Sequence, residues 1–160
     1  KSAPRPPLRN RPRKVATQRT GKRYLVIGGH GMLGSHIVEA LLARGEEHVG
    51  VLDLSRSPLF ADEPAVRFHQ GSILDRDVLR RACEGVDTVL HTAASVSFWA
   101  DLPFELGPNA VNVLGTEAVI DACIAASVKQ LLYTSSCSVV VPRDPTRDVL
   151  EYADESTPYR

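Results

Sequence analysis

From Tyr24 onward, short hydrophobic runs alternate with longer amphipathic segments, a pattern typical of βαβ units around a parallel sheet. The runs predict five strands, at 23–27, 48–53, 65–70, 88–92 and 130–135. Most of them are rich in Val, Leu and Ile, as expected for strands that are buried on both faces. The sequence therefore predicts an α/β protein with a Rossmann-type, doubly wound parallel sheet.

Helices are predicted between these strands. The first carries an apolar stripe of Leu33, Ile37, Leu41 and Leu42. The second begins at a capping residue, Asp75, and ends at Gly85. The third spans about residues 105–126, and its sheet-facing positions are expected to be Leu106, Val113, Leu114, Ala118, Ala122 and Ala125.

The first 22 residues differ in composition from the rest of the chain. They are rich in proline and arginine and contain almost no apolar residue, so they cannot bury enough surface to offset the entropy of ordering. We interpret 1–22 as a basic, disordered arm or linker and 23–160 as the dinucleotide-binding domain. The arginine content also suits an organelle transit peptide, although the prolines oppose the amphipathic helix of such peptides.

The 19 basic and 19 acidic residues cancel over the whole chain, but residues 1–23 contain no acid. The domain that follows is therefore strongly acidic and repels phosphate backbones. No nucleic-acid partner is expected, and membrane contact is expected only through the arm or through segments outside this sequence. A homodimer or a larger assembly is left open.

The three cysteines, Cys83, Cys123 and Cys137, show neither metal-ligand spacing nor a disulfide pattern. No metal site is predicted, and a reducing compartment fits best. The cytoplasm or the cytosolic face of the endoplasmic reticulum is favoured, with organelle import as the alternative. No apolar run approaches the ~18 to 20 residues of a membrane span.

A glycine-rich loop follows the first predicted strand and precedes a helix, with the sequence Gly28-Gly29-His30-Gly31-Met32-Leu33-Gly34. Gly28 permits a tight turn, Gly31 lets the backbone approach a pyrophosphate, and Gly34 lets the helix pack against the strand. Free N–H groups at the helix start attract the anion. This context predicts a dinucleotide site, and the alternative is a glycine turn that binds nothing.

Asp53 ends the second predicted strand, nineteen residues after Gly34. A carboxylate there can accept hydrogen bonds from both ribose hydroxyls of the adenosine and would repel a 2′-phosphate, so NAD is favoured over NADP. Arg56, three residues later, softens that preference. The alternative role for Asp53 is to cap the following loop. His30 and His91 are interpreted as structural.

Six motifs in order resemble the extended short-chain dehydrogenase/reductase superfamily, and within it the 3β-hydroxysteroid dehydrogenase/isomerase group that includes sterol-4α-carboxylate 3-dehydrogenases. They are residues 26–34, Val51-Leu52-Asp53, Gly71-Ser72-Ile73, residues 89–94, Asn112-Val113-Leu114-Gly115-Thr116 and Tyr133-Thr134-Ser135-Ser136. By this resemblance, Ser136 is the catalytic serine and Asn112 stabilises the site. The implied cofactor-binding residues are Gly28, Gly29, Gly31, Met32, Leu33, Gly34, Asp53, Ser72, Ile73, Ala93 and Ala94.

The sequence departs from the family pattern in two places. Many relatives carry an acid after the third strand, where this chain has Ser72, so the adenine contact is expected to be weaker or to pass through Ser72. The family's Tyr-x-x-x-Lys pair is not found, because Tyr24, Tyr133 and Tyr152 have no Lys four residues later. The last strands and the substrate domain are missing too. We expect either a fragment of a longer enzyme or a shortened relative kept for binding.

The resemblance implies an NAD-dependent oxidoreductase that oxidises a secondary alcohol on a sterol-like or other apolar substrate to a ketone. One alternative is a nucleotide-sugar epimerase or dehydratase, which uses the same site with a transient hydride. Another is a non-catalytic, dinucleotide-binding scaffold subunit, because the missing Tyr/Lys pair leaves the chain without a base for alcohol oxidation.

Overall fold

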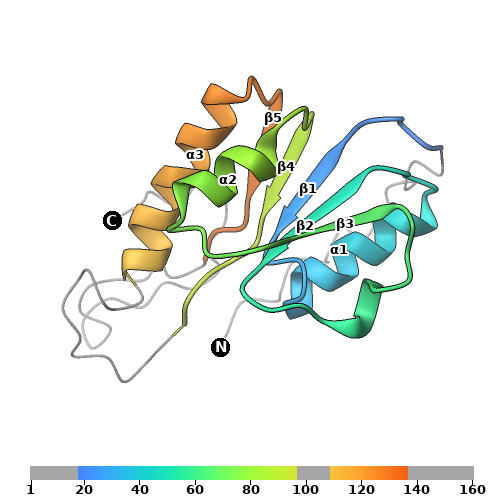
Figure 1. Ribbon diagram of the computed structural model, residues 1–160, viewed down its shortest axis with the longest axis horizontal. Coiled ribbons are helices and arrows are strands. Elements are labelled where there is room, and N and C mark those ends of the chain that lie inside the picture. The colour runs from blue at the N-terminus through green and yellow to red at the C-terminus, as the bar shows by residue number, and fades with distance from the viewer. Residues whose placement is uncertain (1–17, 97–108, 137–160) are drawn as a thin grey trace, which may run out of the picture.

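A computed structural model describes residues 18–96 and 109–136 of the chain (Figure 1). Its central element is a parallel sheet of five strands. The strands are β1 (Tyr24–Ile27), β2 (Val49–Asp53), β3 (Val66–Gln70), β4 (Thr88–His91) and β5 (Gln130–Tyr133). Each predicted strand is confirmed and is one or two residues shorter than the sequence indicated.

The strands lie in the order β3-β2-β1-β4-β5. The chain builds outward from β1 to β3 and then crosses back to place β4 on the other side of β1. The strand order therefore reverses between β1 and β4, which is where open α/β sheets bind ligands beyond the carboxyl ends of their strands. This topology confirms the predicted doubly wound fold.

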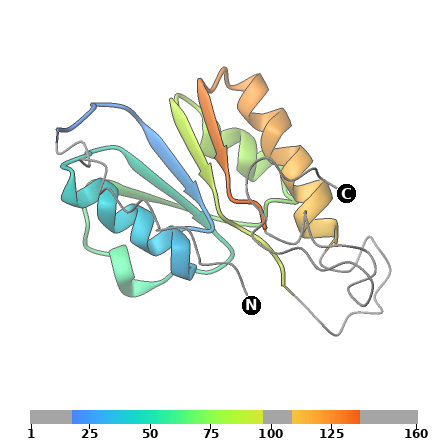
Figure 2. The same cartoon turned by 180° about the vertical axis from the view of Figure 1, so that it is seen from behind.

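Helices cover both faces of the sheet, as Figures 1 and 2 show. They are α1 (Met32–Ala43), α2 (Arg76–Cys83) and α3 (Thr116–Ala125). The alternation along β1 sorts the core into two layers: Leu25 and Ile27 belong to the cluster formed with α2 and α3, whereas Tyr24 and Val26 belong to the cluster formed with α1. All four β1 residues are buried, so β1 lies at the centre of the domain.

The predicted stripe of α1 is confirmed for Ile37, Leu41 and Leu42, which belong to or pack against the core layer of this helix, and is wrong for Leu33. Leu33 is 44% exposed, while Gly34, Val38 and Leu41 are buried. The start of the helix lies close against the glycine-rich loop, where only Gly34 leaves room for that approach. This close backbone contact, which a periodicity of apolar residues does not report, sets the orientation of the helix.

The second helix agrees with its sequence signals. The Asp75 side chain caps α2 by accepting hydrogen bonds from the N–H groups of Asp77 (3.0 Å) and Val78 (3.1 Å). Gly85, with φ +70°, follows the end of the helix. Cys83 at the end of α2 and Cys123 on α3 are free, buried thiols in the core.

The predicted third helix is not a uniform α-helix in its described part. It opens as a π-helical segment, η2 (Ala110–Gly115), and continues as α3. Contrary to the prediction, Val113 and Leu114 are 41% and 39% exposed and Ala125 is exposed, whereas Ala110 and Gly115 are buried. A π turn holds more residues than an α turn, so it shifts the face that a 3.6-residue period predicts. Leu106 lies outside the described residues.

Within the described ranges, no helix is long and apolar enough to cross a membrane.

Candidate functional site

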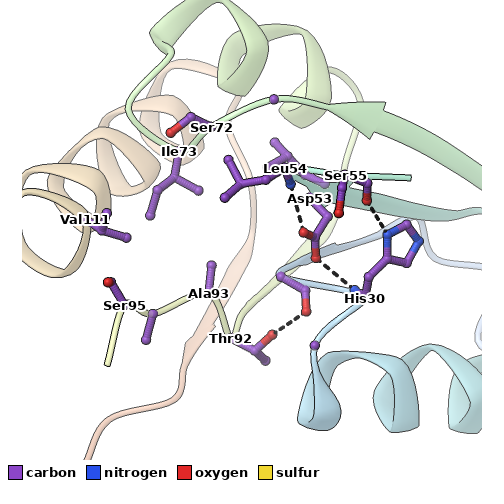
Figure 3. Close-up of a pocket in the computed structure, with 15 residues that line it drawn as sticks. His30, Asp53, Leu54, Ser55, Ser72, Ile73, Thr92, Ala93, Ser95 and Val111 are labelled. Atoms are coloured by element: carbon purple, nitrogen blue, oxygen red, sulfur yellow. Dashed lines mark hydrogen bonds between the residues drawn. The ribbon is translucent and has the colours of Figure 1, made fainter. Parts of the chain in front are cut away.

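A cavity of about 470 Å³ opens at the carboxyl ends of β1, β2 and β4, at the point where the strand order reverses (Figure 3). Its lining consists of Gly28, His30, Gly31, Leu52, Asp53, Leu54, Ser55, Gly71, Ser72, Ile73, Thr92, Ala93, Ala94, Ser95 and Val111. Of the predicted cofactor residues, the lining includes Gly28, Gly31, Asp53, Ser72, Ile73, Ala93 and Ala94. The others, Gly29, Met32, Leu33 and Gly34, lie beside it in the loop and the first turn of α1.

The glycine-rich loop is packed so tightly that side chains do not fit at two of its positions. Gly28 has φ +81°, and a Cβ there would lie 2.7 Å from the Ala93 nitrogen. A Cβ on Gly34 would lie 2.1 Å from the Gly28 oxygen. Glycine is required at both positions, because a backbone conformation and a close approach demand it. The two residues thereby bring β1, β4 and α1 together around the cavity.

The N-terminus of α1 offers unpaired backbone donors. No side chain caps the helix, its N-cap residue is Gly31, and its first turn holds no acidic residue. The Ser35 N–H bonds to the Gly31 oxygen (2.9 Å), so the N–H groups of residues 32–34 precede the regular helical series. Met32 is 84% exposed and does not line the cavity. Such a terminus attracts anions such as a pyrophosphate.

Asp53 lies at the carboxyl end of β2 and connects the glycine-rich loop to the segment that follows β2. Its Oδ2 accepts a hydrogen bond from the His30 N–H (2.9 Å), and its Oδ1 accepts one from the Leu54 N–H (2.8 Å). Each carboxylate oxygen keeps capacity for a further donor. The two roles considered for Asp53, capping the following loop and contacting the ribose, are therefore compatible. Asp53 caps its own loop and also lines the cavity (Figure 3).

His30 forms part of the cavity wall. Its Nδ1 lies 2.8 Å from the Ser55 oxygen, and its ring stacks on Phe68 at 5.0 Å and on Phe60 at 6.2 Å between ring centroids. These contacts fit the structural role that the sequence indicated. The Arg56 guanidinium lies over Phe68, 6.0 Å from the ring centre, and Arg56 is not among the lining residues.

The segment after β4 is held from two sides. Thr92 donates its hydroxyl hydrogen to the Ile27 oxygen (2.8 Å). Asn112 in η2 pairs with the Ser95 backbone: its Oδ1 accepts from the Ser95 N–H (2.8 Å), and its Nδ2 donates to the Ser95 oxygen (2.8 Å). Asn112 is therefore a positioning residue for the cavity wall that contains Ala93 and Ala94.

The opposite wall comes from the loop after β3. The Ser72 hydroxyl oxygen accepts a hydrogen bond from the Leu74 N–H (3.1 Å). Ile73 is 5% exposed and packs against Gly115, where a Cβ would lie 2.5 Å from the Ile73 Cδ1. Figure 3 shows Ile73, Val111 and Ala93 around the same space. The glycine in η2 thus brings the apolar side of the cavity close to the sheet.

Ser136 follows β5 and is exposed, and it does not line this cavity. His91 in β4 is fully buried, its Nε2 lies 3.2 Å from the Thr116 hydroxyl oxygen, and its ring centroid lies 5.2 Å from that of Tyr133. Burial lowers the pKa of His91, which favours a neutral imidazole and a structural role.

Ser95 and Val111 line the cavity but were not among the site residues predicted from the sequence. Ser95 follows the motif residue Ala94 directly, but its two bonds to Asn112 bridge segments that the chain separates by 17 residues. The position of Val111 in the cavity wall was not predicted, because the π-helical segment changes which residues face the cavity. Within the described residues, no group of three or more His, Cys, Asp or Glu side chains could hold a metal ion.

A Rossmann sheet with a glycine-rich loop at its switch point is the architecture of a dinucleotide-binding domain. The model of the 3-beta hydroxysteroid dehydrogenase/isomerase family matches residues 25–160, and the chain belongs to this family.

Curated relatives include human sterol-4-alpha-carboxylate 3-dehydrogenase, decarboxylating, which is 42% identical over 77% of this chain and 31% of its own length. A 3 beta-hydroxysteroid dehydrogenase/Delta 5-->4-isomerase from Mycobacterium tuberculosis is 37% identical over 86% of this chain and 36% of its own. The chain thus spans about a third of these relatives.

Solved structures with a similar fold contain NAD. The dTDP-glucose 4,6-dehydratase DesIV from Streptomyces venezuelae, solved with NAD, has a TM-score of 0.72 and 30% identity, covering 86% of this chain and 45% of DesIV. The UDP-glucose 4-epimerase of Thermus thermophilus in complex with NAD has a TM-score of 0.69 and 33% identity, covering 86% and 44%. These neighbours agree with NAD as the predicted cofactor.

Proposed function

We propose that this chain binds NAD at the carboxyl end of its sheet and forms the cofactor-binding part of an oxidoreductase of the 3β-hydroxysteroid dehydrogenase type. The observation that carries the proposal is the convergence of three features on one cavity: the uncapped start of α1, the Asp53 carboxylate, and small residues after β4. Each suits one part of a dinucleotide.

The residues present fit the cofactor. The N–H groups at the start of α1 would hold the pyrophosphate, and the glycines leave room for its approach. The Asp53 oxygens, each with capacity beyond its backbone bond, would accept from the ribose hydroxyls. Ile73 and Val111 supply apolar surface for the adenine, with the Ser72 hydroxyl beside them. Ala93 and Ala94 leave the sheet edge open for the rest of the dinucleotide.

In the proposed reaction, a secondary alcohol on a sterol-like or other apolar substrate is oxidised to a ketone. NAD, when bound, supplies the nicotinamide ring that accepts the hydride. By the family resemblance, the Ser136 hydroxyl donates a hydrogen bond to the substrate oxygen as charge develops there. Asn112 keeps the Ser95 segment in place through its amide. By the same resemblance, the alcohol proton would pass to the tyrosine of a Tyr-x-x-x-Lys pair, which Tyr24, Tyr133 and Tyr152 do not form because none has a lysine four residues later.

The names of the curated relatives support a sterol-like substrate, since those proteins act on sterols or hydroxysteroids and are 37% and 42% identical to this chain. The alternative is a nucleotide sugar, the substrate class named for the dehydratase and epimerase neighbours at 30% and 33% identity. A sterol requires an apolar pocket, whereas a nucleotide sugar requires cationic side chains.

Titration of NADH into the chain, followed by nicotinamide fluorescence, tests the cofactor site. We expect saturable binding that weakens by about tenfold or more in Asp53→Ala, because the variant loses charge-assisted acceptors. Asp62→Ala is the control, since Asp62 is an exposed acid outside the cavity. Absence of binding by the folded parent would refute the proposal.

The activity is tested on a full-length protein that contains this chain. We expect NAD reduction with a 3β-hydroxysterol and no conversion of a UDP- or dTDP-sugar, the latter followed by product analysis because a transient hydride leaves no net NADH. Turnover of the nucleotide sugar alone would favour the epimerase or dehydratase alternative. NAD binding without turnover of either substrate would favour the scaffold alternative.

A further inference from the structure

A second cavity, of about 460 Å³, lies at the opposite end of the sheet, at the amino ends of β1, β2 and β3 and beside the end of α2. Five basic side chains line it, Arg23, His48, Arg67, His69 and Arg81, together with the acidic Glu47 and Glu84. None of them lines the cavity at the carboxyl end. The concentration of arginine is unusual for this domain, because acidic residues outnumber basic ones after residue 23.

The hollow arises from the residues that β2 and β3 place on the α2 side of the sheet. Gly50 in β2 pairs in register with Arg67 in β3, and Leu52 pairs with His69. Leu52 belongs to the core layer that includes α2, so Gly50, Arg67 and His69 lie on this same face. Gly50 presents no side chain on this face: a Cβ there would lie 3.0 Å from the Leu25 Cδ1 and 3.8 Å from the His69 Nε2.

The arginines of this cavity have no acidic partner in the described part of the chain. The two glutamates in the lining pair with other residues: Glu47 with Arg19, and Glu84 with Arg80 at 3.6 Å. No ion pair forms to Arg23, Arg67 or Arg81 among the described residues. Among the described residues, these three guanidinium groups therefore lack a carboxylate partner.

The pKa of His69 is sensitive to the positive charges in this cavity. Burial lowers its pKa, and the positive charges of Arg67 and Arg81 lower it further. The dipole at the end of α2 stabilises a cation in the last turn, which accounts for Arg81 but not for Arg67 on β3. A bound anion would pair with the guanidinium groups and relieve their repulsion of a charged His69.

We propose that this cavity binds a small phosphate-bearing anion, with the guanidinium groups of Arg67 and Arg81 as its principal donors. Arginine presents a planar fork of N–H donors that matches phosphate oxygens, and a charge-assisted pair of this kind is stronger than a neutral hydrogen bond. The volume admits a phosphate ester or a pyrophosphate. This site is independent of the dinucleotide site and lies at the other end of the strands.

Inorganic pyrophosphate is the probe, titrated at constant ionic strength into the chain with saturating NAD present, so that the glycine-rich loop is already occupied. The readout is the imidazole NMR signal of His69. We expect a saturable shift and a raised His69 pKa in the bound form. In Arg67→Gln and Arg81→Gln, the dissociation constant should rise about tenfold or more, because each loses a charge-assisted contact.

Arg76→Gln is the matched control, because it removes the same charge from the same helix at a residue paired with Asp121 at 2.9 Å. The affinity of this variant for pyrophosphate should stay within about twofold of that of the parent, as expected for a solvent-screened charge. Circular dichroism and unfolding midpoints establish that each variant is folded. An unsaturable His69 shift in the folded parent, or equal weakening in Arg76→Gln, would overturn the proposal.

Discussion

The two ends of the sheet carry cavities of similar volume, about 470 and 460 Å³, whose linings differ in the source of their positive potential. At the carboxyl end, the lining is mostly glycine, alanine and serine with one carboxylate, and the positive potential comes from backbone N–H groups at the start of α1. At the amino end, the lining holds three arginines and two histidines, and the positive potential comes from side chains.

The two sites have different origins in the fold. The carboxyl-end site follows from the fold, because parallel strands separated by helices place helix N-termini at that end of the sheet. The amino-end site follows from individual residues, because side chains distant in the sequence meet there only through strand register. Substitutions should therefore affect the two ends in different ways.

The largest effect is expected for Gly34→Ala. A Cβ at residue 34 would lie 2.1 Å from the Gly28 oxygen, so the loop and α1 must separate. We expect NAD affinity to fall by about a hundredfold or more, equivalent to about 2.7 kcal/mol. NADH fluorescence measures the loss. Gly45→Asn is the control, because Gly45 also has a positive φ but no atom within 4 Å of a Cβ, and unchanged affinity in Gly34→Ala would contradict the account.

The amino end also contains a buried carboxylate, Glu46. Its Oε1 accepts hydrogen bonds from the Thr20 N–H and hydroxyl and from the Arg44 Nε, each at 2.9 Å. Glu46→Gln should lower the free energy of unfolding by about 2 kcal/mol at pH 7, because charge-assisted bonds in a buried site are lost. Urea unfolding measures the change. Glu47→Gln is the control, since Glu47 pairs with Arg19 in solvent and should cost less than about 0.5 kcal/mol.

The contribution of Glu46 to the free energy of unfolding depends on pH in a defined direction. Burial raises its pKa, but the bonds from Thr20 and the charge of Arg44 outweigh burial and leave the pKa below its ordinary value of 4.5. The stabilisation is therefore fully present above about pH 4.5 and is lost as the pH falls through the folded-state pKa. The difference between parent and Glu46→Gln should shrink in acid, and a difference that grows there would refute this assignment.

A smaller effect is expected for Asn112→Asp at the carboxyl end. Aspartate keeps the acceptor for the Ser95 N–H but replaces the donor to the Ser95 oxygen with a repelling oxygen. We expect NAD affinity to fall about tenfold, or about 1.4 kcal/mol, because the wall that carries Ala94 shifts. Asn109→Asp is the control, as the Asn109 side chain makes no capping bond. Equal affinity of the two variants would show that Asn112 does not position the site.

The smallest effect is expected for Arg56→Gln. Its guanidinium lies over Phe68 and does not line the cavity. The ratio of NAD to NADP affinity should therefore change by less than about twofold, within the range of an exposed cation–π contact. Fluorescence titrations with NADH and NADPH measure the ratio. A large gain for NADH would mean that Arg56 reaches the ribose, as its sequence position suggested.

The sequence predicted the features that depend on local residue type. Apolar runs gave the five strands, Asp75 gave the start of α2, and the glycine spacing gave the loop at the switch point. These signals are readable because turn, cap and strand preferences act over a few residues. Asp53 was found for the same reason, since it directly ends a strand.

Features that depend on packing between distant segments were not predictable. The buried face of η2 differs from the prediction because Ile73 packs on Gly115 within a π-helical segment, which no 3.6-residue period reports, whereas Ala118 and Ala122 of α3 pack at the core as predicted. The pairing of Asn112 with the Ser95 backbone and the meeting of Arg67 with Arg81 likewise require the folded sheet.

Amide NMR spectra of the isotope-labelled chain, recorded during titration with NAD, locate the dinucleotide site residue by residue. We expect saturable shifts at Gly28–Gly34, Asp53 and Ala93–Ser95, with no comparable shifts at Arg67, His69 or Arg81. Saturating NAD that leaves the glycine-rich loop unchanged, or that shifts only the amino-end residues, would contradict the assignment of the dinucleotide site to the carboxyl end of the sheet.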